Sequence, residues 1–215
     1  MVQDKMGAKH AGAMDISAGC SGYIYAVACA SNMVKAGMYD NVLVIGAEIL
    51  SRLVDWQDRS TCILFGDGAG AAVIGQVDEG YGLLASELGS DGSLGKILNI
   101  PASGVAEPVT HRAIDSKRIY IHMEGSEVFK AAVRHMGQTT LSTLEKAGIT
   151  KEDINMFIAH QANDRIIQSL AKKLSIPSDR MYVNVDRYGN TSAASVGIAL
   201  DEAVRAGLSL IHISE

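Results

Sequence analysis

The fold class follows from residues 15–48, "DISAGCSGYIYAVACASNMVKAGMYDNVLVIGAE". A helical pattern over 21–36 ends at Gly37, and a short β-rich run follows at 41–48. The same alternation continues along the chain. Further strands are predicted at 61–66, 71–77, 155–160 and 180–185, and further helices at about 125–147, 163–174 and 193–206. Short strands that alternate with helices are typical of an α/β protein with buried sheets.

Size, composition and charge narrow the class of protein. The chain has 215 residues, 47% hydrophobic and 20% charged, so it can bury a large core. No apolar run reaches the roughly 18 uncharged residues that cross a bilayer, and no secretory leader pattern opens the chain, so we expect a cytoplasmic protein that does not bind membranes. The net charge of −5, without a basic tract, argues against nucleic-acid binding. Three cysteines without metal-ligand spacing fit a reducing compartment and argue against a metal site.

The chain is predicted to consist of two halves. Between Gly80 and about Arg118 it becomes rich in Gly, Ser and Pro, which is typical of a long connection. We therefore expect an N-terminal half at 1–90, a connection at 91–118 and a C-terminal half at 119–215.

The two halves share a short internal match. When "VKAG" at 34–37 is aligned with "VRAG" at 204–207, Cys20 falls opposite Asn190, and each of the two follows a glycine. A duplicated α/β unit would place Cys20 and Asn190 at helix starts that face one cleft.

Two roles are open for Cys20. A thiol in the first turn of a helix lies near the positive end of the helix dipole, which favours the thiolate and lowers the pKa. Packing is the alternative, because free cysteines are among the most buried residues. Cys29 and Cys62 keep the packing role, since one is expected within a helix and the other within a strand.

His160 and Asn190 lie at two further strand-to-helix junctions. His160 ends the apolar run 155–160, and catalytic groups in α/β sheets gather at the carboxyl ends of strands. Asn190 ends a β-rich run and precedes a predicted helix, where an ordinary N-cap is the alternative.

The motifs around these three residues resemble those of the β-ketoacyl-acyl-carrier-protein synthase III family, condensing enzymes of the thiolase superfamily that start bacterial fatty-acid synthesis. The matching stretches are "DISAGCSG" at 15–22, "FGDGAGAAV" at 65–73, "LGSDGS" at 88–93, "MEGSEVFK" at 123–130, "HQAN" at 160–163 and "GNTSAAS" at 189–195. The resemblance covers about residues 1–207. It implies a thiolase-like α/β fold whose two related halves form a five-layer αβαβα arrangement.

The resemblance also implies a mechanism. Cys20 would take the acyl group from acetyl-CoA or another short acyl-CoA. His160 and Asn190 would donate hydrogen bonds to the thioester carbonyl of malonyl-acyl-carrier protein while CO2 leaves. Both thioesters are substrates, and no cofactor is expected. A homodimer is implied by the resemblance alone.

Further site residues come from the same resemblance. The expected channel residues are Asn163 and Gly125 along the pantetheine, Leu64 and Phe65 near the acyl pocket, and Phe129 at the mouth. Lys130, Arg165, Lys172 and Lys173 lie in segments that the family uses to dock its acidic carrier protein. Helix geometry places Arg165 and Lys172 on one face, although a solvated charged face is the alternative.

Other interpretations stay open. "GDGAGA" at 66–71 fits a dinucleotide-binding turn, but a predicted strand follows it, so we expect tight glycine turns between strands. "AGCSG" at 18–22 also suits an α/β-hydrolase with a cysteine nucleophile. A related enzyme of polyketide or secondary metabolism is a further alternative, since the starter acyl group cannot be read from the sequence.

The last alternative is an inactive fragment. The family is longer at both ends, and here "LSLIHISE" at 208–215 stands where the family continues to a glycine-rich loop. That loop supplies an oxyanion-hole donor in the family, so we expect weak acyl transfer from a chain that lacks it.

Overall fold

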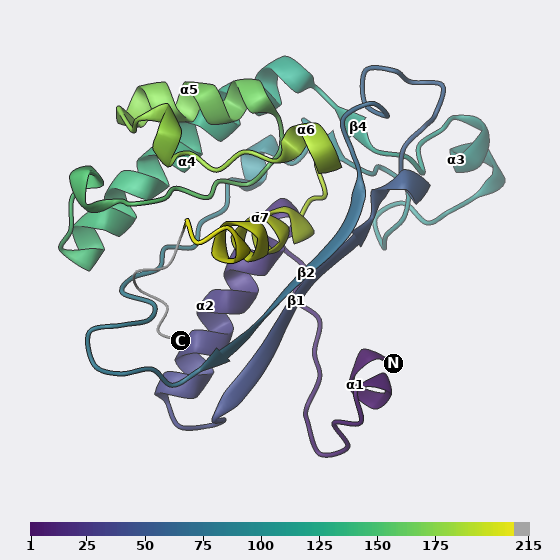
Figure 1. The fold of residues 1–215 in the computed structure, drawn as a ribbon. Helices are drawn as coiled ribbons and strands as arrows, with labels where there is room; N and C mark the ends of the chain where they lie inside the picture. The colour runs from purple at the N-terminus through teal and green to yellow at the C-terminus, as the bar shows by residue number, and fades with distance from the viewer. Residues whose placement is uncertain (209–215) are drawn as a thin grey trace.

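The computed structural model describes residues 1–208 as an α/β arrangement (Figure 1). The helices are α1 (Val2–Lys5), α2 (Gly22–Lys35), α3 (His111–Asp115), α4 (Gly125–Ala147), α5 (Asp164–Leu174), α6 (Val185–Tyr188) and α7 (Ala194–Arg205). The strands are β1 (Asn41–Ile49), β2 (Asp67–Gly75), β3 (Leu98–Asn99) and β4 (His122–Met123). Short 3₁₀ turns lie at Gly19–Ser21, Leu50–Arg52, Gly92–Leu94, Lys151–Asp153 and Ser178–Arg180.

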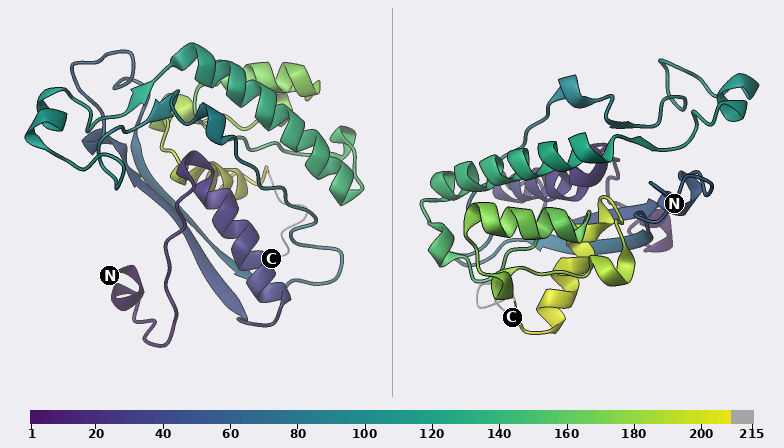
Figure 2. Two further views of the ribbon diagram at one scale, coloured as in Figure 1. Left: turned by 180° about the vertical axis from the view of Figure 1, so that it is seen from behind. Right: turned by 90° about the horizontal axis from the view of Figure 1, so that it is seen from above.

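A long antiparallel ribbon of β1 and β2 carries α2 and α7 on one face (Figures 1 and 2). Buried and exposed residues alternate along β1, as expected for strands with one covered face. On the covered face, Val44 of β1 packs with Tyr23 of α2 and Val196 of α7. The ribbon and the two helices therefore share one hydrophobic cluster.

Glycines in both strands allow α7 to lie directly on the ribbon. A Cβ added at Gly46 would lie 2.6 Å from the carbonyl oxygen of Ala193, and one added at Gly70 would lie 2.6 Å from the carbonyl carbon of Gly197. Glycine within a strand is typical of such close backbone approach. Because Gly70 lies inside β2, the expectation of tight turns at "GDGAGA" is wrong.

The second half adds two further layers. Ile167, Leu170 and Leu174 of α5 form a cluster with the extended segments around Phe157 and Met181, and Met136 of α4 packs against it. Phe157 belongs to this cluster, whereas its neighbour Ile158 packs against the α2–β1–α7 cluster. The extended segments thus separate the two helix pairs. Among the described residues the order is ribbon, α2 with α7, extended segments, then α4 with α5 (Figure 1), which is four of the five expected layers.

The long predicted helices are confirmed as α2, α4, α5 and α7, each with limits within one residue of the prediction. The strand at 41–48 is confirmed as β1, and the one at 71–77 overlaps β2. The strands at 155–160 and 180–185 are wrong as full strands, because they meet only at a parallel bridge between Phe157 and Met181.

The side chain of Gln161 explains why that pairing stops. Its Nε2 donates to the carbonyl oxygen of Tyr182 at 3.1 Å, and its Oε1 accepts from the backbone N–H of Asn184 at 2.9 Å. These backbone groups would otherwise seek partners on a neighbouring strand. One buried side chain therefore replaces the continuation of the ladder.

Residues 61–64 form turns and Phe65 makes only an isolated bridge with Asn190, so the strand predicted at 61–66 is also wrong. The carboxylate of Asp58 accepts hydrogen bonds from the hydroxyls of Ser60 at 2.6 Å and Thr61 at 2.7 Å. Such local bonds stabilise turns and compete with sheet ladders. Cys62 is buried in this turn, consistent with a packing role.

The predicted connection holds only short elements, and its β3 pairs with β4. The division at 1–90, 91–118 and 119–215 stays a prediction. Within "LSLIHISE", residues 209–215 lie outside the described residues. Over residues 1–208, no helix has the length and apolar character to cross a membrane. In the same part of the chain, no group of three or more His, Cys, Asp or Glu residues is placed to hold a metal ion.

Candidate active site

Cys20 lies at a helix start, as predicted. It belongs to the 3₁₀ turn Gly19–Ser21, which leads directly into α2. Gly19 has φ +53°, in the left-handed region that favours glycine, so the glycine before the cysteine allows the chain to turn sharply into the helix. The thiol is half-buried at this junction.

The pKa of Cys20 differs from the expectation. Burial raises the pKa of the thiol, and the nearby Glu48 carboxylate adds to that effect. A hydrogen bond from the Ser192 hydroxyl to Sγ, at 3.5 Å, acts in the opposite direction. The prediction of a lowered pKa is therefore wrong, because the desolvation of the thiol outweighs the effect of the helix dipole. Cys20 is a thiol at neutral pH.

The backbone of Asn190 is fixed by the segment that contains Leu64 and Phe65. Its N–H donates to the carbonyl oxygen of Leu64 at 2.8 Å, and its carbonyl oxygen accepts from the N–H of Gly66 at 2.9 Å. Gly189, with φ +65°, brings the chain close to Leu64. This contact places Asn190 beside the "LFG" segment, although the two are far apart in sequence.

The side chain of Asn190 has a defined orientation. It is buried, and its Oδ1 accepts a hydrogen bond from the backbone N–H of Ser192 at 2.8 Å. Because the oxygen is occupied in this way, the Nδ2 amide remains as a hydrogen-bond donor. The residue at the N-cap position of α7 is Ala193, so Asn190 is not an ordinary helix cap.

His160 is uncharged at neutral pH. Its ring is half-buried, and burial lowers its pKa from 6.5 to about 4. The Nδ1 atom lies 2.6 Å from the hydroxyl oxygen of Ser195, the second residue of α7. The side chain of Ser195 is almost fully buried.

The loop at 190–195 joins the three predicted catalytic residues. It contains Asn190 itself, its Ser192 touches Cys20, and its Ser195 touches His160. Both serines lie within "GNTSAAS", but the sequence alone predicted no role for them. The available signal was a pair of serines two and five residues after Asn190, next to a predicted helix start, where short hydroxyl side chains often bond to neighbouring groups.

The predicted channel residues lie in three places. Leu64 and Phe65 adjoin Asn190, and both are half-buried. Asn163 is the N-cap of α5, where its Oδ1 accepts from the N–H of Arg165 at 2.8 Å. Gly125 is the first residue of α4, and Phe129 lies half-buried one turn later. Their roles along a channel stay predictions.

The four predicted docking cations have different surroundings. Arg165 and Lys172 are exposed on α5. Lys130 forms an exposed ion pair with Glu127 at 2.8 Å. Lys173 instead extends across α4, where its Nζ donates to the carbonyl oxygens of Val133 and Arg134 at 3.2 and 3.4 Å.

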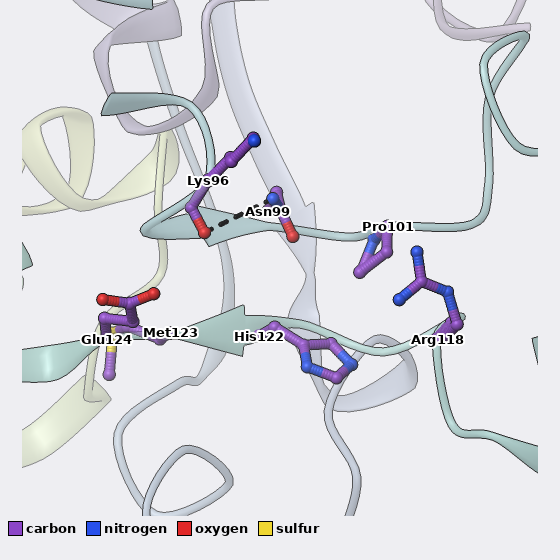
Figure 3. Close-up of a pocket in the computed structure, with 7 residues that line it drawn as sticks. All are labelled: Lys96, Asn99, Pro101, Arg118, His122, Met123 and Glu124. Carbon is purple, nitrogen blue, oxygen red and sulfur yellow. Dashed lines mark hydrogen bonds between the residues drawn. The ribbon is translucent and has the colours of Figure 1, made fainter. Parts of the chain in front are cut away.

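A separate hollow of about 580 Å³ lies beside the paired strands β3 and β4 and the segments that flank them (Figure 3). It is lined by Lys96, Asn99, Pro101, Arg118, His122, Met123 and Glu124. Most of its polar side chains are exposed, and Arg118 is already held by Glu107. We place the chemistry at Cys20, because buried and mutually bonded polar groups meet there.

The scaffold and these three side chains define the class. It is an α/β protein of the thiolase-like fold. A cysteine at a helix start and an uncharged histidine both contact one segment, residues 190–195, which also contains the asparagine. The family model for 3-oxoacyl-(acyl-carrier-protein) synthase III matches residues 14–92, and the model for the C-terminal part of that family matches residues 144–210. The chain belongs to the 3-oxoacyl-(acyl-carrier-protein) synthase III family.

Individual relatives agree with this assignment. The beta-ketoacyl-(acyl-carrier-protein) synthase III of Caldanaerobacter subterraneus is 56% identical over 208 residues, which are 97% of this chain and 63% of the relative. The crystal structure of 3-oxoacyl-(acyl-carrier-protein) synthase III from Aquifex aeolicus VF5 is 47% identical with a TM-score of 0.88, over 97% of this chain and 63% of that one. The priming beta-ketosynthase of the R1128 polyketide pathway is 35% identical with a TM-score of 0.84, over 97% and 61% of the two chains.

These similarities confirm the thiolase-like fold and the family resemblance. They also show that the α/β-hydrolase alternative is wrong. The chain spans about 63% of the length of the curated relative and of the Aquifex protein.

Proposed function

We propose that this protein catalyses the decarboxylating condensation of a short acyl-CoA, acetyl-CoA first, with malonyl-acyl-carrier protein, and so initiates fatty-acid synthesis. The observation that carries the proposal is the set of contacts made by residues 190–195. Ser192 bonds to Cys20, and Ser195 bonds to His160. The Oδ1 atom of Asn190 is already bonded, which leaves its Nδ2 amide as a donor. Family membership supports the choice of reaction.

In the first step, Cys20 accepts the acyl group. Its Sγ attacks the thioester carbonyl carbon of acyl-CoA, the new S–C bond forms, and the bond to the CoA sulfur breaks. The thiol proton ends on the departing CoA sulfur. Because burial keeps Cys20 protonated, the hydroxyl of Ser192 is important here: it donates to the sulfur as negative charge develops.

In the second step, the malonyl thioester loses CO2. The electron pair of the breaking C–C bond moves into the thioester and forms an enolate. His160 and Asn190 donate hydrogen bonds to the enolate oxygen. The enolate carbon then attacks the acyl-Cys20 carbonyl, a new C–C bond forms, the bond to Sγ breaks, and the released thiolate takes up a proton from solvent. Asn190 donates at any pH, and His160 stays neutral because its pKa is about 4.

The reaction requires no metal or organic cofactor, because both reactants are activated thioesters. We further propose that Asn163, Gly125, Phe129, Leu64 and Phe65 line the path of the pantetheine and the acyl group. Cytoplasmic location and a homodimer are proposed on the family resemblance.

We propose that the carrier protein docks on α5. The exposed Arg165 and Lys172 lie on this helix, and no ion pair involves either of them within residues 1–208. Exposed cations of this kind attract an acidic partner and accelerate its association. Lys130 is a weaker candidate because Glu127 already pairs with it.

Mass spectrometry tests the acyl transfer. After incubation with acetyl-CoA, we expect one acetyl group on the peptide that contains Cys20, and none in Cys20→Ala. Cys29→Ala is the matched control, because Cys29 lies within α2, nine residues after Cys20, and is not one of the proposed site residues, so its variant should still be acetylated at Cys20. A wild-type protein that takes no acetyl group would overturn the proposal.

Asn190→Ala tests the second step. The variant should still be acetylated, while decarboxylation of malonyl-acyl-carrier protein falls on the order of a hundred-fold or more. Equal loss of both steps would show that Asn190 supports the fold rather than the enolate.

A priming enzyme of polyketide synthesis is the second candidate, favoured by the similarity to the R1128 ketosynthase. A series of acyl-CoA primers of increasing length separates the two. Preference for acetyl-CoA supports the first function, whereas preference for longer primers supports the second.

A further inference from the structure

Ser195 touches His160 but has no place in the reaction steps above. Its hydroxyl lies 2.6 Å from Nδ1 of His160 and 3.3 Å from the backbone nitrogen of Gln161. Its residue is 2% exposed, so bulk water does not reach the hydroxyl. The two contacts together determine which way the hydroxyl proton points.

The backbone N–H of Gln161 can only donate, so the oxygen of Ser195 accepts that hydrogen bond. The serine then has one proton left to give. Within the described residues, the acceptor in reach of that proton is Nδ1 of His160. If Nδ1 carried the proton instead, Ser195 would accept two hydrogen bonds and its own proton would be buried without a partner, which is costly.

The direction of the bond fixes the tautomer of His160. A neutral imidazole has one N–H, and His160 is neutral at pH 7. When Nδ1 accepts from Ser195, the ring proton must be on Nε2. Nε2 is then the hydrogen-bond donor of the ring.

Gln161 holds Ser195 in place. Its Nε2 donates to the carbonyl oxygens of Ala159 at 2.9 Å and Tyr182 at 3.1 Å, and its Oε1 accepts from the N–H of Asn184 at 2.9 Å. This residue is 1% exposed, and its side chain has both polar atoms bonded. Three hydrogen bonds of the side chain therefore hold Gln161 in place, and with it the backbone N–H that donates to Ser195.

We propose that Ser195 is a positioning residue that holds His160 as the Nε2–H tautomer, so that His160 can donate to the thioester carbonyl oxygen when CO2 leaves. The chemical consequence rests on the proposed function, whereas the tautomer itself does not. With the wrong tautomer, a lone pair would face the developing enolate, and its stabilisation would be lost.

Nitrogen NMR reads the tautomer directly. The ¹⁵N signals of His160 in the 215-residue protein at pH 7 are assigned by their absence in His160→Gln. We expect a protonated Nε2 and an unprotonated Nδ1 in the wild type, and a shift towards protonated Nδ1 in Ser195→Ala. A wild-type spectrum with the proton on Nδ1 would overturn the proposal without any need for a variant.

The two half-reactions separate positioning from structural support. Ser195→Ala should slow malonyl decarboxylation on the order of a hundred-fold, in kcat rather than KM, because one donor to the enolate is lost. Acetylation of Cys20 should change by no more than a few-fold. Ser195→Thr retains the hydroxyl and should recover decarboxylation. Ser31→Ala, which removes another buried serine hydroxyl, is the matched control and should leave both half-reactions unchanged.

The failures are distinguishable. If wild-type protein takes no acetyl group, the proposed function fails, and the NMR spectrum still decides the role of Ser195. If Ser195→Ala loses both half-reactions equally and retains the Nε2–H tautomer, Ser195 is only structural and this inference is wrong.

Discussion

The hydroxyl of Ser192 donates a hydrogen bond to the thiol sulfur of Cys20 across 3.5 Å. The backbone N–H of the same serine donates to Asn190 Oδ1 at 2.8 Å. Ser192 has φ +49°, in the left-handed region that a residue with a side chain rarely adopts. Its backbone is therefore strained where its two polar groups reach two different side chains of the proposed catalytic site.

Replacing Ser192 with alanine or glycine should separate these effects. Both variants lose the donor to sulfur, so the pKa of Cys20 should rise further and alkylation by iodoacetamide at pH 8 should slow. Glycine also relieves the strained backbone, so Ser192→Gly should be more stable than Ser192→Ala by about 1 kcal/mol. Peptide mass spectrometry distinguishes Cys20 from Cys29 and Cys62, and urea unfolding measures stability. If Cys20 in both variants were alkylated as fast as in wild type, the hydroxyl of Ser192 would have no effect on the thiol.

His160 should make the protein sensitive to acid. Its pKa is about 4 when folded and 6.5 when unfolded, so the unfolded state binds more protons between these values. Above pH 6.5 the group has no effect on the free energy of unfolding. As pH falls from 6.5 towards 4, stability is lost, by about 2 kcal/mol between pH 7 and pH 5.

Urea unfolding of wild type and His160→Gln at pH 7 and pH 5 measures this loss. The variant should lose less stability on acidification than wild type, whatever its stability at pH 7. His10→Gln is the control, because His10 is exposed and its removal should leave the pH dependence as in wild type. If the free energy of unfolding had the same pH dependence in wild type and His160→Gln, His160 would not have a lowered pKa in the folded protein.

Gly70→Ala should disrupt the contact between β2 and α7. The added Cβ would lie 2.6 Å from the backbone at Gly197, and neither backbone can move without disturbing the ribbon or the helix. We expect a destabilisation of about 2–3 kcal/mol or more, measured by urea unfolding. Gly104→Ala is the matched control, since a Cβ there meets nothing within 4 Å, and it should change stability by no more than about 0.5 kcal/mol. Equal effects of the two substitutions would argue against this packing.

Local patterns were sufficient for the helices and for the three junction residues. Helical periodicity and glycine stops predicted α4 at its observed limits, because both signals lie within the helix itself. Cys20, His160 and Asn190 were found through motifs and predicted helix starts, although the strands predicted before His160 and Asn190 are wrong and α6 lies just before Asn190. The hydrogen bonds at 190–195 now join them in space.

Other features depend on residues far apart in sequence. Burial of Cys20 by distant segments reverses the expected direction of its pKa, and no local pattern reports that burial. The strand predicted at 180–185 stops because the side chain of Gln161 bonds its backbone. The roles of Ser192 and Ser195 likewise require contacts that bring separate parts of the chain together.

The cations on α5 should divide into docking and structural residues. Lys173 crosses α4 next to Gly137, where an added Cβ would lie 2.9 Å from its Cε, and its ammonium donates to two α4 carbonyl oxygens. Lys173→Ala should therefore lower the Tm, while kcat and KM should stay close to the wild-type values.

Arg165→Glu and Lys172→Glu should instead impair recognition of the carrier protein. Each reversal replaces an exposed attractive charge with a repulsive one, so KM for malonyl-acyl-carrier protein should rise several-fold to about ten-fold at low salt and less at high salt. Acetylation of Cys20 by acetyl-CoA, measured in the same preparations, should stay as in wild type, because the acidic carrier takes no part in that step. If Lys173→Glu raised this KM as much as Arg165→Glu does, the division between docking and structural cations would be wrong, and a diffuse positive surface would explain binding better.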